Sequence, residues 1–157
     1  MRRTSPAMHV AYERIPRPDW ASTTTVAIPV GAAEWASPER WARAIFDTKA
    51  LPRWVVGLFA LRRGVVAVLG IPPGEPTMLE VGPVIDGEAV IDTDDRHLRF
   101  VATTWLSPGL VHVTTAVQLK GLRGRIYFVP VRVLHDPVTR AMMRGAARRL
   151  AAGPWPN

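Results

Sequence analysis

Apolar side chains recur at helical spacing in some segments of this chain and alternate every second residue in others. Residues 22–30, rich in Thr and Val, predict a first strand. Ser37 and Pro38 supply the N-cap and first-turn signals of a helix, which we expect to stop before Pro52 because the residue preceding a proline avoids helical dihedrals. Pro52 itself can open a second helix. The buried stripe expected of that second helix is Trp54, Leu58, Leu61, Val65 and Val68.

Further along the chain, alternation of apolar and polar residues predicts a run of antiparallel strands. The predicted strands are residues 79–85, 88–91, 97–106, 110–119 and 126–134. Asp86 and Gly87 form a strong turn dipeptide between the first two, which therefore predict a hairpin. Pro130 interrupts the last strand and points to an edge position or a bulge, because proline cannot donate a hydrogen bond to a neighbouring strand.

The final helix is expected to begin at Asp136 and Pro137 and to end at Gly153. Its apolar sector holds Val138, Met142, Met143, Ala146 and Leu150, and its opposite side holds Arg140, Arg144 and Arg148. This helix has an apolar side wide enough to cover the face that an antiparallel sheet must bury. We therefore predict a single α+β domain over residues 22–153, with an extended arm at 1–21 and a tail at 154–157. Its sheet would be antiparallel, with two short helices after the first strand.

Two stretches carry a resemblance to known proteins. One runs from Asp95 to Phe100, and the other is Gly124-Arg125-Ile126-Tyr127, followed by Val131, His135, Arg140, Met142 and Arg144. They resemble a bacterial family of unknown function within the START and polyketide-cyclase-like superfamily, whose members stand alone or follow a dinucleotide-binding domain. The resemblance implies the helix-grip fold, in which a curved sheet wraps the last helix and leaves a cavity between them. Gly82 and Gly87 do not reproduce the superfamily's glycine-rich loop.

The amino-acid composition limits the classes of function that this chain can have. The chain has 157 residues, of which 48% are hydrophobic and 21% charged, as expected of one globular domain. It contains no cysteine, which excludes disulfide scaffolds and thiol nucleophiles. The net charge of +7 comes mostly from arginine, and no interleaved aromatic and basic pattern indicates nucleic-acid binding. We see no transmembrane segment and no signal peptide, and expect a cytoplasmic protein.

Four residues are weak candidates for acid–base catalysis. Asp95 and His97 lie in an acidic cluster between two predicted strands, where a carboxylate can orient a histidine. The simpler alternative is a polar turn whose carboxylates pair with neighbouring arginines. His135 shares strand parity with Tyr127 and can face the mouth of a cavity, or it can be a structural histidine beside the start of the last helix. No paired metal ligands or phosphate loop are present in the sequence, so we expect no metal and no cofactor.

The leading hypothesis is a protein that binds a small hydrophobic ligand between the sheet and the last helix. The residues expected to line the cavity are Trp41, Trp54, Leu58, Phe100, Tyr127, Val129, His135 and Met142. Ordinary core packing of these side chains is the alternative. Two further hypotheses stay open: a cyclase or dehydratase that uses acid–base residues of the cavity, and an interaction protein that uses the arginine face of the last helix. The sequence permits a homodimer, although no feature specifies one.

Overall fold

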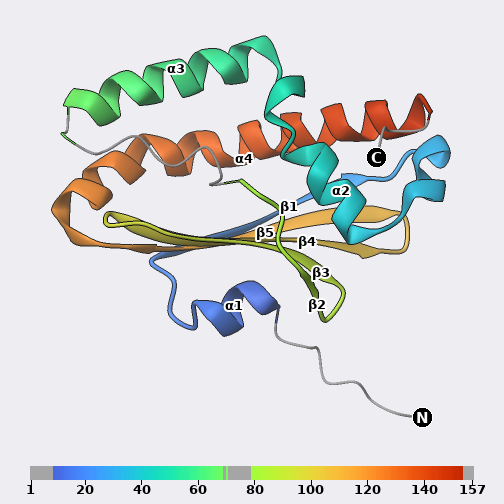
Figure 1. The fold of residues 1–157 in the computed structure, drawn as a ribbon, viewed down its shortest axis with the longest axis horizontal. Helices are drawn as coiled ribbons and strands as arrows, with labels where there is room; N and C mark the ends of the chain where they lie inside the picture. The colour runs from blue at the N-terminus through green and yellow to red at the C-terminus, as the bar shows by residue number, and fades with distance from the viewer. Residues whose placement is uncertain (1–8, 69, 71–78, 154–157) are drawn as a thin grey trace.

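The computed structural model describes residues 9–68, 70 and 79–153, which form a curved five-stranded antiparallel sheet and its covering helices (Figure 1). The strand order is β1–β5–β4–β3–β2. The strands are β1 (Trp20–Ala27), β2 (Val84–Ile85), β3 (Glu88–Asp94), β4 (Leu98–Ser107) and β5 (Leu110–Leu119). The helices are α1 (Val10–Arg14), α2 (Pro38–Ile45), α3 (Arg53–Val68) and α4 (Gly121–Ala151), with short 3-10 turns η1 (Val30–Trp35) and η2 (Thr48–Ala50).

This architecture confirms the predicted α+β class, in which helices follow the first strand and a long helix follows the sheet. Helices α2 and α4 cover one side of the sheet, here called the α4 face, and α1 covers the other, the α1 face (Figure 1). The predicted tail at 154–157 and residues 1–8 of the predicted arm lie outside the described residues.

The larger hydrophobic core lies between the α4 face, α2 and the carboxy-terminal half of α4. Trp41 and Ile45 of α2 pack there with Met143 and Leu150 of α4 and Val113 of β5, all of them almost completely buried. Burying each large apolar side chain contributes roughly 1.5–3 kcal/mol. Ser37 Oγ accepts a hydrogen bond from the backbone N–H of Arg40, as its predicted N-cap role requires. This core fixes α2 and α4 on the sheet.

On the opposite face, part of the segment predicted as an extended arm is helical. Val10, Ala11 and Ile15 bury their side chains against Val90 and Val101 of the sheet. Three apolar residues within six positions therefore outweigh the nearby prolines, because together they cover a patch of sheet that water would otherwise contact. Trp20 begins β1, two residues earlier than predicted.

The predicted turn at Asp86 and Gly87 is confirmed, with both residues at positive φ, as a two-residue turn requires. The first strand of the hairpin spans only Val84–Ile85 of the predicted 79–85. The predicted strand at 126–134 is wrong, because these residues belong to α4. Several of these residues are β-branched, and Pro130 and Pro137 each remove a helical hydrogen bond. Local preference therefore favours extended backbone over a helix. The helix forms nonetheless, since it places Tyr127 and Phe128 against the sheet and leads directly into the core.

The predicted buried stripe of α3 is also wrong. Trp54, Leu61 and Val68 are exposed and Leu58 is half-buried, while the side chain of Val65 lies outside the described part. The reason is position: α3 lies outside α4 and not on the sheet (Figure 1), so it has little surface to pack against.

Gly124 allows α4 to approach the turn between β3 and β4. A Cβ at this buried position would clash with the backbone carbonyl of His97, whereas a Cβ at Gly57 of α3 would meet nothing within 4 Å. We expect Gly124→Ala to lower the free energy of unfolding by about 1–3 kcal/mol through overpacking. Gly57→Ala should raise it by up to about 1 kcal/mol through helix propensity. Urea denaturation measures both, and equal effects of the two variants would contradict the assigned close approach.

Candidate functional site

A row of side chains crosses the α4 face beneath the amino-terminal half of α4. Strand pairing places Thr93, Phe100, Val117 and Trp20 side by side across β3, β4, β5 and β1. Val117 is buried and the other three are half-buried. We call this row, together with the α4 side chains that cover it, the interlayer strip.

Aromatic side chains of α4 cover the strip at its β1 end. The Trp20 ring meets Phe128 edge-on at a centroid distance of 5.4 Å and His135 at 4.7 Å. Tyr127, the residue before Phe128 on the helix, is buried against Leu98. The strip therefore offers mainly apolar and aromatic walls.

His135 is the polar group of this site. Its Nδ1 is buried and, within the part of the chain that is described, has no hydrogen-bond partner. Burial lowers the pKa of the His135 imidazole, although the nearby Asp136 carboxylate opposes this shift. Burial therefore favours the neutral form of the ring, which presents an unsatisfied nitrogen.

Ser22 is a second unsatisfied group facing the same turn of α4. Its neighbours on the same face of β1 both contact that turn: Trp20 meets His135, and Thr24 Oγ1 donates a hydrogen bond of 2.6 Å to Asp136. The Ser22 hydroxyl between them is buried and has no partner among the described residues. Two polar groups thus lie close to one turn of the helix without bonding each other.

Asp136 and Arg140 fasten this turn to the sheet. The hydrogen bond from Thr24 lowers the pKa of Asp136, and the charge of Arg140 adds to the shift. Arg140 also donates to the backbone carbonyl of Thr25 at 3.2 Å. Because this anchor lies beside His135, it fixes the position of the imidazole relative to β1.

The predicted catalytic residues Asp95 and His97 lie at the other end of α4. The Lys120 N–H donates to the His97 carbonyl at 2.8 Å, and the Lys120 ammonium contacts both the Asp94 carboxylate and the Asp95 carbonyl. His97 also lies against Gly124, eleven residues before His135, which corresponds to about 16 Å of helix. The acidic cluster therefore holds the start of α4, and its histidine does not reach His135.

The predicted ligand-lining residues separate into three groups. Phe100, Tyr127 and His135 belong to the interlayer strip. Trp41 and Met142 are part of the closely packed hydrophobic core. The remaining three lie away from the sheet: Trp54 and Val129 are exposed, and Leu58 is half-buried on α3. Sequence reasoning missed Trp20 and Phe128, although the helical spacing of Phe128 and His135 becomes visible once 126–134 is taken as helix.

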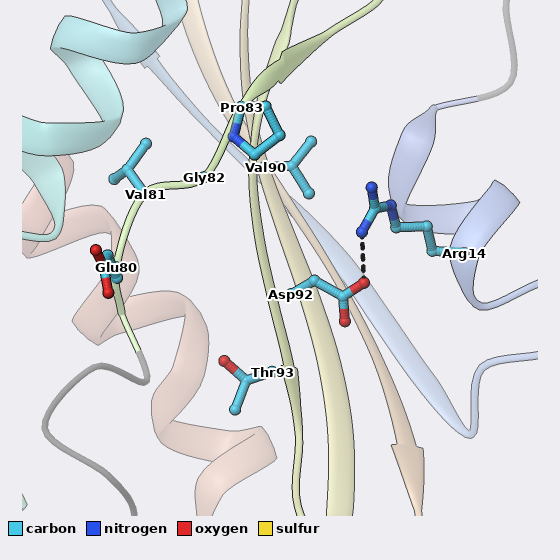
Figure 2. Close-up of a pocket in the computed structure, with 8 residues that line it drawn as sticks. All are labelled: Arg14, Glu80, Val81, Gly82, Pro83, Val90, Asp92 and Thr93. Atoms are coloured by element: carbon cyan, nitrogen blue, oxygen red, sulfur yellow. Dashed lines mark hydrogen bonds and ion pairs between the residues drawn. The ribbon is translucent and has the colours of Figure 1, made fainter.

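An open cleft of about 340 Å³ lies at the β3 edge of the sheet (Figure 2). Glu80, Val81 and Thr93 line it on the side of α4, whereas Arg14 and Asp92 line it on the side of α1. Burial favours a raised pKa for Asp92, but hydrogen bonds from Arg99 and Arg14 outweigh it and leave the pKa lowered. With Arg14 at 2.7 Å and Arg99 at 3.0 Å, this carboxylate is already neutralised by protein groups.

A polar network on the α1 face was not expected from the sequence. His112, which the alternation predicts to be solvated, is buried and stacks on Trp105 at 3.8 Å. Its Nδ1 is 2.8 Å from Thr25 Oγ1 and its Nε2 is 2.7 Å from Ser107 Oγ. Burial lowers its pKa. Both ring nitrogens are thus satisfied, which indicates a structural role in joining three strands.

The described residues contain neither a cluster of metal ligands nor a membrane-spanning helix. Within residues 9–68, 70 and 79–153, no group of three histidine or acidic side chains is arranged to hold a metal ion. None of the helices over the same ranges is both long and apolar enough to cross a bilayer.

We expect the imidazole pKa of His135 to lie below its ordinary value of 6.5 because the charged form is poorly solvated in the interlayer. A histidine whose folded pKa is lowered stabilises the fold above its unfolded pKa, and that stability is lost as the pH falls through the folded value. An NMR titration of the native and urea-unfolded protein compares the two values directly. A native pKa equal to or above the unfolded one would contradict the burial of this ring.

Comparison with known proteins assigns most of the chain to one family. The family described as "Protein of unknown function (DUF2867)" matches residues 15–142, which include β1 to β5 and the first two-thirds of α4. No curated protein and no solved structure matches the chain. The matched region contains the interlayer strip and most of the core. The chain therefore belongs to the DUF2867 family of proteins of unknown function.

Proposed function

We propose that this protein binds a small, largely apolar molecule that carries at least one hydrogen-bonding group. The ligand would lie in the interlayer strip, between the α4 face and the amino-terminal half of α4. The observation that carries the proposal is the pair of buried, unpartnered polar atoms facing one turn of α4, His135 Nδ1 and Ser22 Oγ. Leaving such groups unpaired costs about 1–3 kcal/mol each, so native proteins usually satisfy them with a partner, a water molecule or a ligand.

The chemistry of the walls supports a ligand that is apolar over most of its surface. Trp20, Phe100 and Phe128 offer aromatic surface, and Val117 offers aliphatic surface between them. A neutral imidazole accepts or donates one hydrogen bond without demanding a charged partner. A hydroxyl, carbonyl or phenol attached to a hydrophobic skeleton fits these walls better than an anion does.

The remainder of the layer limits where the ligand can lie. Trp41 and Met142 pack with the apolar side chains around them, so the carboxy-terminal half of α4 leaves a filled core beneath it. At the opposite end of the row, Thr93 also lines the cleft at the β3 edge (Figure 2). We propose that cleft as the entrance. The START and polyketide-cyclase-like superfamily, which the sequence resembles, also places its cavity between sheet and last helix.

Binding is proposed ahead of catalysis because of the spacing of the candidate groups. Of the predicted catalytic residues, Tyr127 and His135 share the layer, and eight helical residues, or about 12 Å, separate them. A ligand of moderate size can contact both. Direct cooperation of the two in a single proton transfer would require groups within hydrogen-bond reach of one atom.

Two matched substitutions compare the effect on stability of removing an unpaired hydroxyl with the effect of removing a paired one. Ser22→Ala should raise the free energy of unfolding, by up to about 1–3 kcal/mol, because it removes a buried hydroxyl that bonds to nothing in the described structure. Thr24→Ala should lower it by about 1.5–3 kcal/mol, because it removes the hydrogen bond to the Asp136 carboxylate. Urea denaturation measures both, and a similar cost for Ser22→Ala would show that its hydroxyl is already satisfied.

The ligand proposal is tested with 1-naphthol and 1-methylnaphthalene, which differ in a hydroxyl and a methyl group. Calorimetric titration should show that the native protein binds 1-naphthol about tenfold more tightly, the equivalent of one useful hydrogen bond of about 1.4 kcal/mol. Ser22→Ala and His135→Phe should lose this preference. Binding of neither probe, or an unchanged preference in both variants, would contradict the proposed site.

A further inference from the structure

Exposed apolar side chains form two rows, one on α3 and one on the first half of α4. On α3 they are Trp54, Leu61 and Val68, and on α4 they are Leu122, Ile126, Val129 and Val133. Each of these residues is at least 49% exposed. The two helices are in contact and lie outside the sheet (Figure 1). We call this set the α3–α4 surface.

The α4 row is a continuous stripe. Its members are spaced by four, three and four residues, which places them on one side of the helix. Tyr127 and Phe128, which are buried against the sheet, lie on the opposite side. On α3 the members recur every seven residues, which again corresponds to a single side. Scattered exposed apolar residues are ordinary, but a continuous row such as the one on α4 is typical of an interaction surface.

Every charged residue in these two helical segments is basic. Neither α3 nor residues 121–135 of α4 contain an aspartate or glutamate. Among the side chains that the structure describes in the two segments, five exposed arginines occur: Arg53, Arg63, Arg123, Arg125 and Arg132. None of the five forms an ion pair with another described residue.

The arginines of α4 lie on both flanks of its stripe. At 100° per residue, Arg123 falls on one side of the apolar row, and Arg125 and Arg132 fall on the other. Long arginine side chains can extend sideways from such positions and keep their charge at a polar boundary while their stems cover apolar surface. A helix with an apolar stripe and basic flanks is the pattern of a segment that lies in the interface of a bilayer.

We propose that the α3–α4 surface docks on the surface of an anionic lipid bilayer. The apolar rows would enter the boundary between headgroups and acyl chains, and the arginines would contact anionic headgroups. Docking leaves the chain on one side of the bilayer, in agreement with the absence of a spanning helix among the described residues. This inference does not depend on the proposed ligand, since the surface and the interlayer strip lie on opposite sides of α4.

Charge argues against the two other occupants. A second copy meeting this surface face to face would bring arginines of both copies together without acidic partners. A nucleic acid would satisfy the arginines but would leave the aliphatic rows without an apolar partner, and Trp54 is the one aromatic residue among the exposed apolar members. An anionic bilayer offers charged headgroups to the arginines and an apolar interior to the exposed apolar rows.

Vesicle sedimentation tests the inference with phosphatidylcholine vesicles that contain or lack phosphatidylserine. We expect binding to the anionic vesicles at least tenfold tighter than to phosphatidylcholine alone, and weaker binding at high salt. Leu61→Glu combined with Val129→Glu should lower anionic-vesicle binding at least tenfold. The matched control is Val84→Glu combined with Leu110→Glu, which changes exposed apolar residues of the sheet and should bind as the native protein does.

A second pair of variants tests the charge. Arg125→Glu combined with Arg132→Glu should reduce binding to anionic vesicles at least tenfold. Arg144→Glu combined with Arg148→Glu makes the same change in net charge on the exposed carboxy-terminal half of α4 and should have a much smaller effect. Circular dichroism and thermal unfolding confirm that each variant is folded.

Three results would overturn the inference: equal binding to both vesicle types, equal losses in the test and control variants, or no binding at all. A fourth contrary result is a self-associating native protein that Leu61→Glu with Val129→Glu converts to a monomer in light scattering, with vesicle binding unchanged. That outcome would assign the surface to contacts between copies of this chain.

Discussion

The structure depends on the packing of one long helix across one face of an antiparallel sheet. Met143 and Leu150 of α4 are buried with Trp41 of α2, and they hold the carboxy-terminal half of the helix. The hydrogen bond from Thr24 to Asp136 then fixes the middle of the helix to β1. Because these two attachments are firm, the amino-terminal half of α4 must lie over Trp20 and the rest of the strip, whatever its own local preferences.

Much of the fold was predictable from the sequence, because local signals and tertiary packing agree there. The Asp86-Gly87 turn, the two long strands β4 and β5, and the Ser37-Pro38 helix start all have chemistry that specifies one structure. The first half of α4 was predicted as a strand. Valines and Pro130 favour extended backbone locally, and the helix is decided by contacts with distant strands.

The same error explains which parts of the candidate site were missed. With residues 126–134 assigned to a strand, Phe128 and Val129 would lie on opposite faces of a sheet, and neither an inner nor an outer side of a helix could be recognised. In the structure Phe128 meets Trp20, and Val129 points away from the sheet. Tyr127 packs on Leu98 and His135 meets Trp20, whereas Val129, which has the same strand parity, is exposed. Strand parity therefore does not explain the inward positions of Tyr127 and His135. The two motifs of the sequence also meet in space, where Leu98 packs on Tyr127.

One helix thus serves two purposes: its inner side bears an unsatisfied imidazole, and its outer side bears an apolar stripe with basic flanks. The central claim is that a bound ligand supplies hydrogen-bond partners to the unpartnered polar groups on the inner side. A crystal structure of protein purified directly from cells, examined around His135 and Ser22, tests it most directly. The account predicts electron density for a molecule larger than water, hydrogen-bonded to at least one of them. Direct bonding of the two side chains to protein groups, in a layer without such density, would contradict it.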